Sequence, residues 1–144
     1  IDASNDLLKN VLAYKPFLVK PNRRELGEMF GVEIEGHEDA LRYARELKKL
    51  GAENVIASLG HEGAVMITQD NEEIVAKAPI GKVINSVGSG DSMVGGFLAG
   101  YLNTGSYRSA FKYAICTGSA TAFTKDFATR RQVDALMALY ELKE

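Results

Sequence analysis

Four consecutive residues, Gly88, Ser89, Gly90 and Asp91, are of the types that phosphate chemistry needs. They stand where an extended segment is expected to lead into a helix, whose first backbone N–H groups lack intrahelical partners and carry the positive end of the helix dipole. Glycine lets the backbone approach an anion closely and adopt positive φ. A carboxylate in the first helical turn is then placed to accept a proton from an attacking hydroxyl. The stretch therefore predicts a phosphate site with Asp91 as its base.

The same stretch also fits an ordinary loop that enters a helix, with Ser89 or Asp91 as the cap, because short glycine patterns are common. Two other phosphate motifs are excluded by the residues present. A dinucleotide fingerprint that starts at Gly88 needs glycine at position 93, where the chain has Met93. A P-loop needs the string G-x-x-x-x-G-K-[ST], which the sequence lacks.

Asn22 and Glu25 stand three residues apart at a predicted helix start, in the string KPNRREL (20–26). Asparagine as the N-cap with glutamate three residues later is a capping-box arrangement that needs no ligand. The two side chains also offer oxygen atoms, which a hard cation prefers, and so suit Mg²⁺ with its waters around nucleotide phosphates. The residues alone leave both interpretations open.

The string SLGHEGA (58–64) reads as a strand end followed by a turn with two glycines. A plain connection between strands has this pattern. Open backbone at the carboxyl end of a parallel strand is also where α/β sheets bind nucleotides. The candidate nucleotide-binding residues in this turn are Ser58, Leu59, Gly60, His61, Glu62 and Gly63.

Taken in order, these motifs resemble the ribokinase-like, PfkB-type family of sugar kinases over nearly the whole chain. The resemblance rests on N-x-x-E at 22–25, S-L-G-x-x-G-A at 58–64 and N-S-V-G-S-G-D-S at 85–92. Within the family, strings such as KPFLVKPNRREL and GSATAFTKDFATR are most similar to the branch that phosphorylates fructose 1-phosphate. The combination favours the functional interpretation of each motif over the structural one.

The resemblance implies ATP-dependent phosphorylation of a phosphosugar, D-fructose 1-phosphate to D-fructose 1,6-bisphosphate, with ATP and Mg²⁺ as cofactors. It makes Asp91 the catalytic base and Gly88, Ser89 and Gly90 the anion hole. Asn22 and Glu25 match the metal and phosphate motif. Residues 58–63, together with Gly90 and Asp91, match the nucleotide-binding set.

Two positions depart from the family's pattern. Where some relatives have an asparagine near the adenine, this chain has Ile115 or Cys116, so no adenine contact is assigned in that helix. Where some have an aspartate near a monovalent cation, this chain has Asn85, so a potassium requirement stays open. The alternatives are a tagatose 6-phosphate kinase and a non-catalytic nucleotide-binding domain. Asp91 argues against the second, because its charge weakens phosphate binding unless it serves chemistry.

An α/β layered fold has to position these residues: the ribokinase-like, Rossmann-type fold, with parallel strands, helices and a β-hairpin. Apolar periodicity and turn residues predict its elements. Helices are expected at 5–13 after a cap at Ser4, at 22–30, from 38 to about 50, at 91–102, at 107–124 and at 131–142. Strands are expected at 16–20 and 54–59, parallel to each other, and at 64–68 and 73–78, as a hairpin.

The bulk composition is that of one globular domain: 144 residues, 46% hydrophobic, 25% charged and a net charge of -2. There is no basic surplus for nucleic acid and no apolar run of membrane-spanning length. A single cysteine fits a reducing compartment, so a cytoplasmic protein is expected. Cys116, His37, His61, Arg130 and Arg131 are expected to be structural or surface residues.

The string IDAS (1–4) reads as a strand end that runs into a helix cap, and the sequence does not begin with Met. We therefore expect residues 1–144 to be the C-terminal nucleotide-binding and catalytic portion of a longer kinase. In the family, the sugar-binding residues and the lid belong mainly to the N-terminal portion. The same absent portion would carry the contacts of a homodimer.

Overall fold

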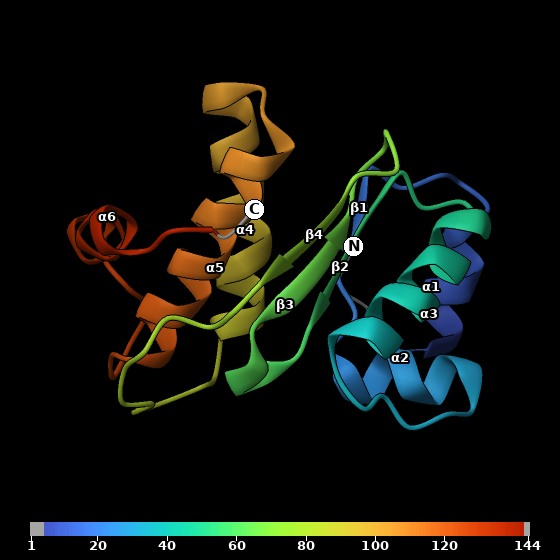
Figure 1. Cartoon of the computed structure of the whole chain (residues 1–144), viewed down its shortest axis with the longest axis horizontal. Helices are drawn as coiled ribbons and strands as arrows, with labels where there is room; N and C mark the ends of the chain where they lie inside the picture. The colour runs from blue at the N-terminus through green and yellow to red at the C-terminus, as the bar shows by residue number, and fades with distance from the viewer. Residues whose placement is uncertain (1–4, 143–144) are drawn as a thin grey trace. The chain divides into compact units, whose positions relative to one another are not determined.

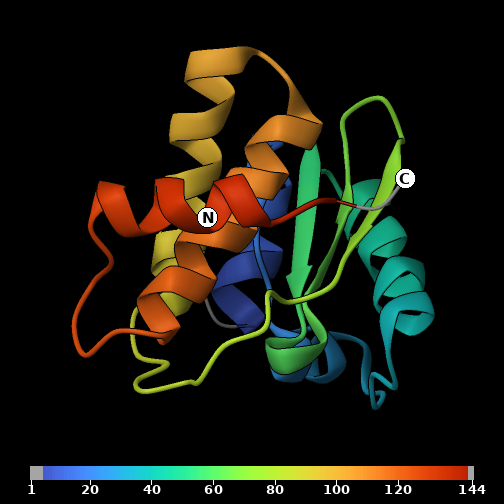
Figure 2. The same cartoon turned by 60° about the vertical axis from the view of Figure 1, so that its left-hand side comes forward.

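The computed structural model describes residues 5–142, and the chain divides into two compact units between Val75 and Ala76 (Figure 1, Figure 2). The predicted strand end at 1–4 and the predicted cap at Ser4 lie outside the described residues. The elements are α1 (Asn5–Leu12), β1 (Leu18–Val19), α2 (Arg23–Phe30), α3 (His37–Lys49), β2 (Asn54–Ser58), η1 (Gly60–Glu62), β3 (Ala64–Ile67), β4 (Glu73–Ala76), α4 (Ser89–Thr104), α5 (Tyr107–Ala122) and α6 (Arg130–Leu139). Every predicted helix and strand is present, with shifted ends.

The first unit is built on a sheet of strand order β1-β2-β3-β4. Strands β1 and β2 run parallel, which confirms the predicted crossover. Strands β2 and β3 run antiparallel, with Ser58 opposite Ala64, so the sheet is mixed. Strands β3 and β4 are neighbours, as the predicted hairpin requires, and Asn71 in the turn between them has a positive φ of 65°.

Strand β1 is shorter than the apolar run 16–20 that predicts it. Pro16 and Pro21 flank the strand, and proline has no N–H group to donate to a ladder. The Pro21 carbonyl still accepts the Ser58 N–H at 3.0 Å. The pairing with β2 therefore continues past the end of β1, up to the predicted site residues.

Helices α1, α2 and α3 cover one face of this sheet (Figure 1). The core that they share with it is apolar, because each helix turns one hydrophobic stripe toward the strands. Helix α2 ends at Gly31, whose left-handed conformation (φ 64°) is the expected stop signal. The main buried residues of this core are Leu8, Leu12, Val19, Leu26, Leu47, Val55, Ala57, Val65 and Ile67.

The second unit pairs α4 with α5 as antiparallel helices that lie side by side (Figure 2). Small residues allow the close approach. A Cβ atom added to Gly118 would lie 2.4 Å from Met93 Cγ, and one added to Gly96 would lie 2.6 Å from Thr117 Oγ1. The start of α4 is thus held tightly against the C-terminal half of α5.

Helix α6 packs on α5 through an apolar cluster formed by Cys116, Ala120 and Val133. Thr129 begins α6 with a capping box that includes Gln132. Tyr140 follows the helix, and its hydroxyl donates to the Lys77 carbonyl at 2.7 Å. Helix α6 is therefore fixed at both ends within the second unit.

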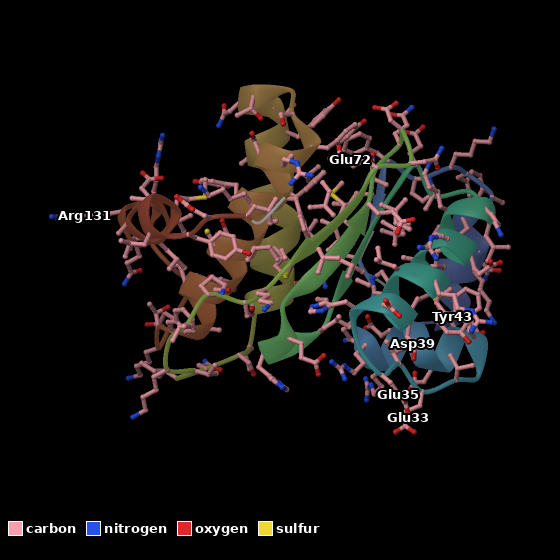
Figure 3. The ribbon with its side chains drawn as sticks, in the orientation of Figure 1. Glu33, Glu35, Asp39, Tyr43, Glu72 and Arg131 are labelled. Atoms are coloured by element: carbon pink, nitrogen blue, oxygen red, sulfur yellow. The ribbon has the colours of Figure 1, made fainter. Side chains whose placement is uncertain are left out.

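The charged side chains of Glu33, Glu35 and Arg131 are exposed, and that of Asp39 is half-buried (Figure 3). Arg130 and Arg131 at the start of α6 are exposed. Asp39, in the first turn of α3, accepts the Glu35 N–H at 3.0 Å. Among residues 5–142, no helix combines the length and the apolar character that crossing a membrane requires.

Candidate functional site

Two of the predicted motifs meet in the first unit. Asn22 and Ser58 form a parallel bridge just beyond the end of β1, and Ser58 is the last residue of β2. The helix start with Asn22 and the turn that follows Ser58 therefore begin side by side, at the carboxyl ends of neighbouring parallel strands. Ligands of α/β sheets bind at such ends.

The start of α2 is a complete capping box. The Glu25 N–H donates to Asn22 Oδ1 at 2.9 Å, and the Asn22 N–H donates to Glu25 Oε2 at 2.8 Å. The structural interpretation of the N-x-x-E motif is thereby confirmed. Each side chain uses one oxygen in this way, and a carboxylate has further acceptor sites on its second oxygen.

Asn22 and Glu25 can supply only part of the coordination shell of a Mg²⁺ ion. Within residues 5–142, no group of three or more His, Cys, Asp or Glu side chains could hold a metal ion. Magnesium usually keeps several waters and binds through one or two carboxylates together with substrate phosphates. Glu25 and Asn22 supply what such a shared site takes from a protein, so they fit the ion when phosphates provide the remaining ligands.

The predicted nucleotide turn is a short 3₁₀ helix between two antiparallel strands, a geometry that the sequence does not indicate. Gly60 and Gly63 both have positive φ, of 61° and 95°, which explains the two glycines of the motif. The Leu59 N–H donates to the Gly63 carbonyl at 2.8 Å and closes the turn. The His61 side chain is 91% exposed, in agreement with its expected place in a solvated turn.

Glu62 is held from two sides. Its carboxylate Oε1 lies 2.6 Å from Nη2 of Arg23, and its carbonyl accepts a hydrogen bond from His37 Nε2 at 2.7 Å. The contact with the Arg23 guanidinium is the main reason why the pKa of Glu62 is lowered. Sequence reasoning missed Arg23 and His37 as partners of the turn, because both lie far from it along the chain.

The other predicted motif opens α4 in the second unit, and here the predicted boundary is wrong. Residues 77–88 form neither strand nor helix, and α4 begins at Ser89, so Ser89 and Gly90 are already helical. The N-cap is Gly88, which is left-handed (φ 79°), and in the described chain no side chain caps this helix. The alternative interpretation, in which Ser89 or Asp91 caps the helix, is therefore contradicted, while Asp91 does lie in the first turn.

The first backbone amides of α4 are arranged as an anion site requires. The Ser89 N–H donates to the Ser86 carbonyl at 3.2 Å. For the amides of Gly90 and Asp91, residues 5–142 provide no backbone acceptor. The Asp91 side chain is exposed beside them. The helix start thus presents two N–H donors and one carboxylate together.

Hydrogen bonds from α5 fix this helix start. The Ser89 hydroxyl donates to the Gly118 carbonyl at 2.8 Å, which explains why it does not cap α4. The buried Thr121 hydroxyl donates to Ser92 Oγ at 3.0 Å and accepts the Ala128 N–H at 3.2 Å. Sequence reasoning missed Thr121, since a threonine in an apolar helix gives no local signal of such a role.

The segment before α4 is tied to the loop after α5. Asn85 Nδ2 donates to the Lys125 carbonyl at 3.2 Å, and Asn85 Oδ1 accepts the Val87 N–H at 3.1 Å. A Cβ atom added at Gly88 would lie 2.6 Å from the Phe127 ring. Glycine at 88 is thus needed both for its left-handed backbone and for this contact.

Cys116 is a structural residue, as expected. It is fully buried, and burial raises the pKa of its thiol to about 11. Ile115 is buried too. Burial also raises the pKa of Tyr140, which lies in the same cluster, to about 12.

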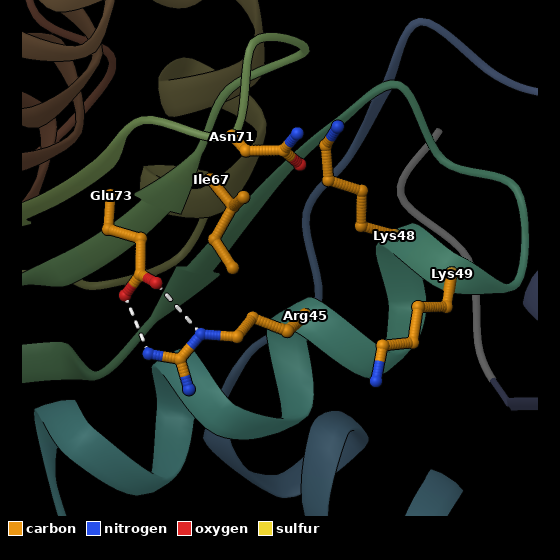
Figure 4. Close-up of a pocket in the computed structure, with 6 residues that line it drawn as sticks. All are labelled: Arg45, Lys48, Lys49, Ile67, Asn71 and Glu73. Atoms are coloured by element: carbon orange, nitrogen blue, oxygen red, sulfur yellow. Dashed lines mark hydrogen bonds and ion pairs between the residues drawn. The ribbon is translucent and has the colours of Figure 1, made fainter.

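A cavity of about 330 Å³ in the first unit lies between α3 and the hairpin and contains none of the predicted site residues (Figure 4). Arg45 and Glu73 span it with paired contacts of 2.8 and 2.7 Å, and Arg45 lowers the pKa of Glu73. Lys48 Nζ donates to the Gln69 carbonyl at 2.8 Å. Because these cations already have partners, we assign no ligand to this cavity.

The predicted site residues thus form two groups. Asn22, Glu25 and the turn 58–63 come together in the first unit, and Gly88–Asp91 lie together in the second.

Comparison with known proteins finds relatives over most of the chain. The model of the pfkB family carbohydrate kinases matches residues 2–130. The 1-phosphofructokinase of Bacillus subtilis is 44% identical over 138 residues, which cover 95% of this chain and 45% of that protein. The D-tagatose-1-phosphate kinase of Bacillus licheniformis is 33% identical over 135 residues, which cover 93% of this chain and 44% of that protein.

A solved structure is also similar. Phosphofructokinase-2 from Escherichia coli, in complex with substrates and products, superposes with a TM-score of 0.86 at 28% sequence identity. The match covers 96% of this chain and 46% of that one. The chain therefore spans a little under half the length of each of these relatives.

Proposed function

The chain belongs to the pfkB family of carbohydrate kinases, and from this premise we propose that the whole protein phosphorylates D-fructose 1-phosphate with ATP, giving D-fructose 1,6-bisphosphate. The fold is the ribokinase-like α/β fold of such kinases. The similarity to a 1-phosphofructokinase over 95% of this chain supports the choice of substrate. In this proposal residues 1–144 supply the nucleotide-binding and catalytic portion, and the sugar-binding and lid residues belong to the rest of the protein.

The observation that carries the proposal is the start of α4, where the exposed Asp91 carboxylate stands beside the amides of Gly90 and Asp91, for which residues 5–142 provide no backbone acceptor. Asp91 takes the proton of the attacking sugar hydroxyl. The sugar oxygen forms a bond to the γ-phosphorus while the bond from that phosphorus to the bridging oxygen breaks, and ADP leaves. The loop Gly88, Ser89 and Gly90 forms the anion hole in this proposal, in which the amides of Gly90 and Asp91 stabilise the charge on the phosphoryl oxygens in the transition state.

The first unit supplies the nucleotide side of the reaction in this proposal. The turn from Ser58 to Gly63 binds ATP through its backbone. Asn22 and Glu25 would hold Mg²⁺ together with the nucleotide phosphates, and the bound ion would neutralise phosphate charge. The bridge between Asn22 and Ser58 supports this grouping, because it keeps the two motifs adjacent.

A second sugar is favoured by one observation, the 33% identity to a D-tagatose-1-phosphate kinase. A panel of fructose 1-phosphate, tagatose 1-phosphate, tagatose 6-phosphate and fructose 6-phosphate, each with ATP, separates the candidates. We expect the highest kcat/KM for fructose 1-phosphate. If the protein prefers a tagatose phosphate, that sugar replaces fructose 1-phosphate as the proposed substrate. If none of the four sugars is phosphorylated, the result favours a non-catalytic nucleotide-binding domain.

The 144 residues alone are expected to bind nucleotide weakly and to show no sugar kinase activity. Turnover by this chain alone would contradict the placement of the sugar site outside it. We further propose a cytoplasmic homodimer whose contacts come from the rest of the protein. The single cysteine supports the reducing compartment.

A further inference from the structure

We propose that Arg23 is a positioning residue of the nucleotide site: it neutralises the Glu62 carboxylate, so that the turn from Ser58 to Gly63 can receive an anionic nucleotide. The inference rests on the proposed function, because it concerns how the same site binds ATP. Arg23 is an intervening residue of the N-x-x-E string. The motif itself assigns it no role.

The geometry of Arg23 ties three segments of the first unit together. Arg23 is the first residue of α2, and its Nη2 atom is buried 2.6 Å from Glu62 Oε1 in the turn. Its Nη1 atom donates to the carbonyl of Ile34, in the loop before α3, at 3.4 Å. The guanidinium thus places its positive charge next to Glu62, from an adjacent helix start, in an ion pair whose two side chains are each about one third exposed.

The charge of Glu62 is the reason why this contact matters. The proposed ligand is a polyanion, and an uncompensated carboxylate inside its binding turn would repel it. Arg23 supplies the closest opposite charge. The other ionisable groups that face Glu62 are His61, whose Nε2 lies 4.0 Å from Oε1, and His37, which contacts the backbone carbonyl. Only Arg23 carries a full positive charge at neutral pH regardless of its surroundings.

The backbone of the turn does not depend on Arg23. The His37 hydrogen bond holds the Glu62 carbonyl, and the bond from the Leu59 N–H to the Gly63 carbonyl closes the turn. An exposed ion pair contributes little to stability. Replacing Arg23 therefore changes the charge of the site more than its shape, and removing the Glu62 charge as well restores the balance.

The test uses the whole protein and ADP as the probe, with affinity measured by titration calorimetry. Arg23→Ala should weaken ADP binding about tenfold, and Arg23→Ala combined with Glu62→Gln should recover affinity to within about threefold of the unchanged protein. Arg24→Ala is the matched control: it removes a neighbouring arginine that pairs with Glu28 at 3.7 Å instead, and it should leave affinity within about twofold. Hydrogen exchange of residues 59–63 should stay unchanged in Arg23→Ala.

Each contrary result has a distinct meaning. If the Arg23→Ala variant binds ADP as tightly as the unchanged protein, the inference is overturned and the proposed function still stands. A loss that Glu62→Gln does not restore, accompanied by faster exchange in the turn, would replace the charge role with a scaffolding role and also overturn it. An unchanged protein that binds no ADP would overturn the proposed function, and the inference with it.

Discussion

Asn22 and Glu25 cap the same helix reciprocally, each side chain accepting the backbone N–H of the other at 2.9 and 2.8 Å. The two residues that are proposed to serve Mg²⁺ are thereby fixed in orientation before any ligand arrives. Asn22 and Glu25 can therefore cap the helix and bind a metal at the same time, because the Asn22 amide oxygen and the Glu25 carboxylate have further lone pairs that the cap does not use.

Substitution of Glu25 can separate the two roles. Glu25→Gln keeps an acceptor for the Asn22 N–H, so the capping box survives and the melting temperature should shift by less than about 2 °C. The loss of charge should raise the Mg²⁺ concentration needed for half-maximal activity. Glu25→Ala, which loses the cap as well, should cost about 1 kcal/mol of unfolding free energy. Unchanged metal dependence in Glu25→Gln would leave the residue with its capping role only.

Asp91→Asn tests the proposed base. Asparagine has the same shape but cannot accept the proton, so kcat should fall by about 10²–10⁴ while the Kd for ATP stays within a few fold. Asp39→Asn is a matched control, because Asp39 occupies the same first-turn position of α3 and lies outside the proposed site. It should leave kcat unchanged. Near-normal turnover by Asp91→Asn would assign the base to another residue.

The contact between α4 and α5 can be tested with two glycines. In Gly118→Ala the new Cβ atom meets Met93 Cγ at 2.4 Å and the Ser89 carbonyl oxygen at 3.1 Å, so the Met93 side chain or the packing of the two helices must shift. We expect a loss of about 1–3 kcal/mol in unfolding free energy, measured by urea denaturation, with a lower kcat. Gly95→Ala has open space around its Cβ and should stabilise the helix by about 0.5–1 kcal/mol. Equal effects of the two substitutions would contradict this packing.

Stability should fall in alkaline solution because of Cys116. Burial raises the pKa of its thiol from 9.0 to about 11. Between these values the unfolded chain has released a proton that the folded chain keeps, so the unfolding free energy decreases as the pH rises. The contribution is complete below pH 9 and is lost progressively up to pH 11, by at most about 1.4 kcal/mol per pH unit. Burial also raises the pKa of Tyr140, so its hydroxyl lowers the unfolding free energy further as the pH rises above the ordinary pKa of 10.0.

Urea denaturation at pH 8 to 11 measures this slope. Cys116→Ala removes the thiol at the cost of a small cavity, so its absolute stability is lower but its decline with pH should be shallower. Parallel declines in the two proteins would mean that other groups, and not the buried thiol, determine the alkaline limit.

The features that follow local rules were predictable from the sequence. Asn22 as the N-cap with Glu25, and Gly31 as the stop of α2, depend only on neighbours within one helical turn. The parallel pairing of β1 with β2 follows from two apolar runs separated by helices.

The features that depend on distant segments were not predictable. The capping rule points to Ser89 or Asp91 at the start of α4, yet the Ser89 hydroxyl bonds to Gly118 and a left-handed Gly88 is the cap. The antiparallel pairing of β2 with β3 and the partners of Glu62 have the same cause: each involves contacts between residues that only the folded chain brings together.

The register between β2 and β3 limits how the nucleotide turn can vary in evolution. Ser58 lies opposite Ala64, so residues 59–63 have a fixed distance to span. Because side chains alternate along a strand, inserting or deleting one residue would shift β3 and turn Val65 and Ile67 from the core toward the opposite face. Homologues should therefore differ in this turn by substitution and not by length, and most freely at the exposed His61.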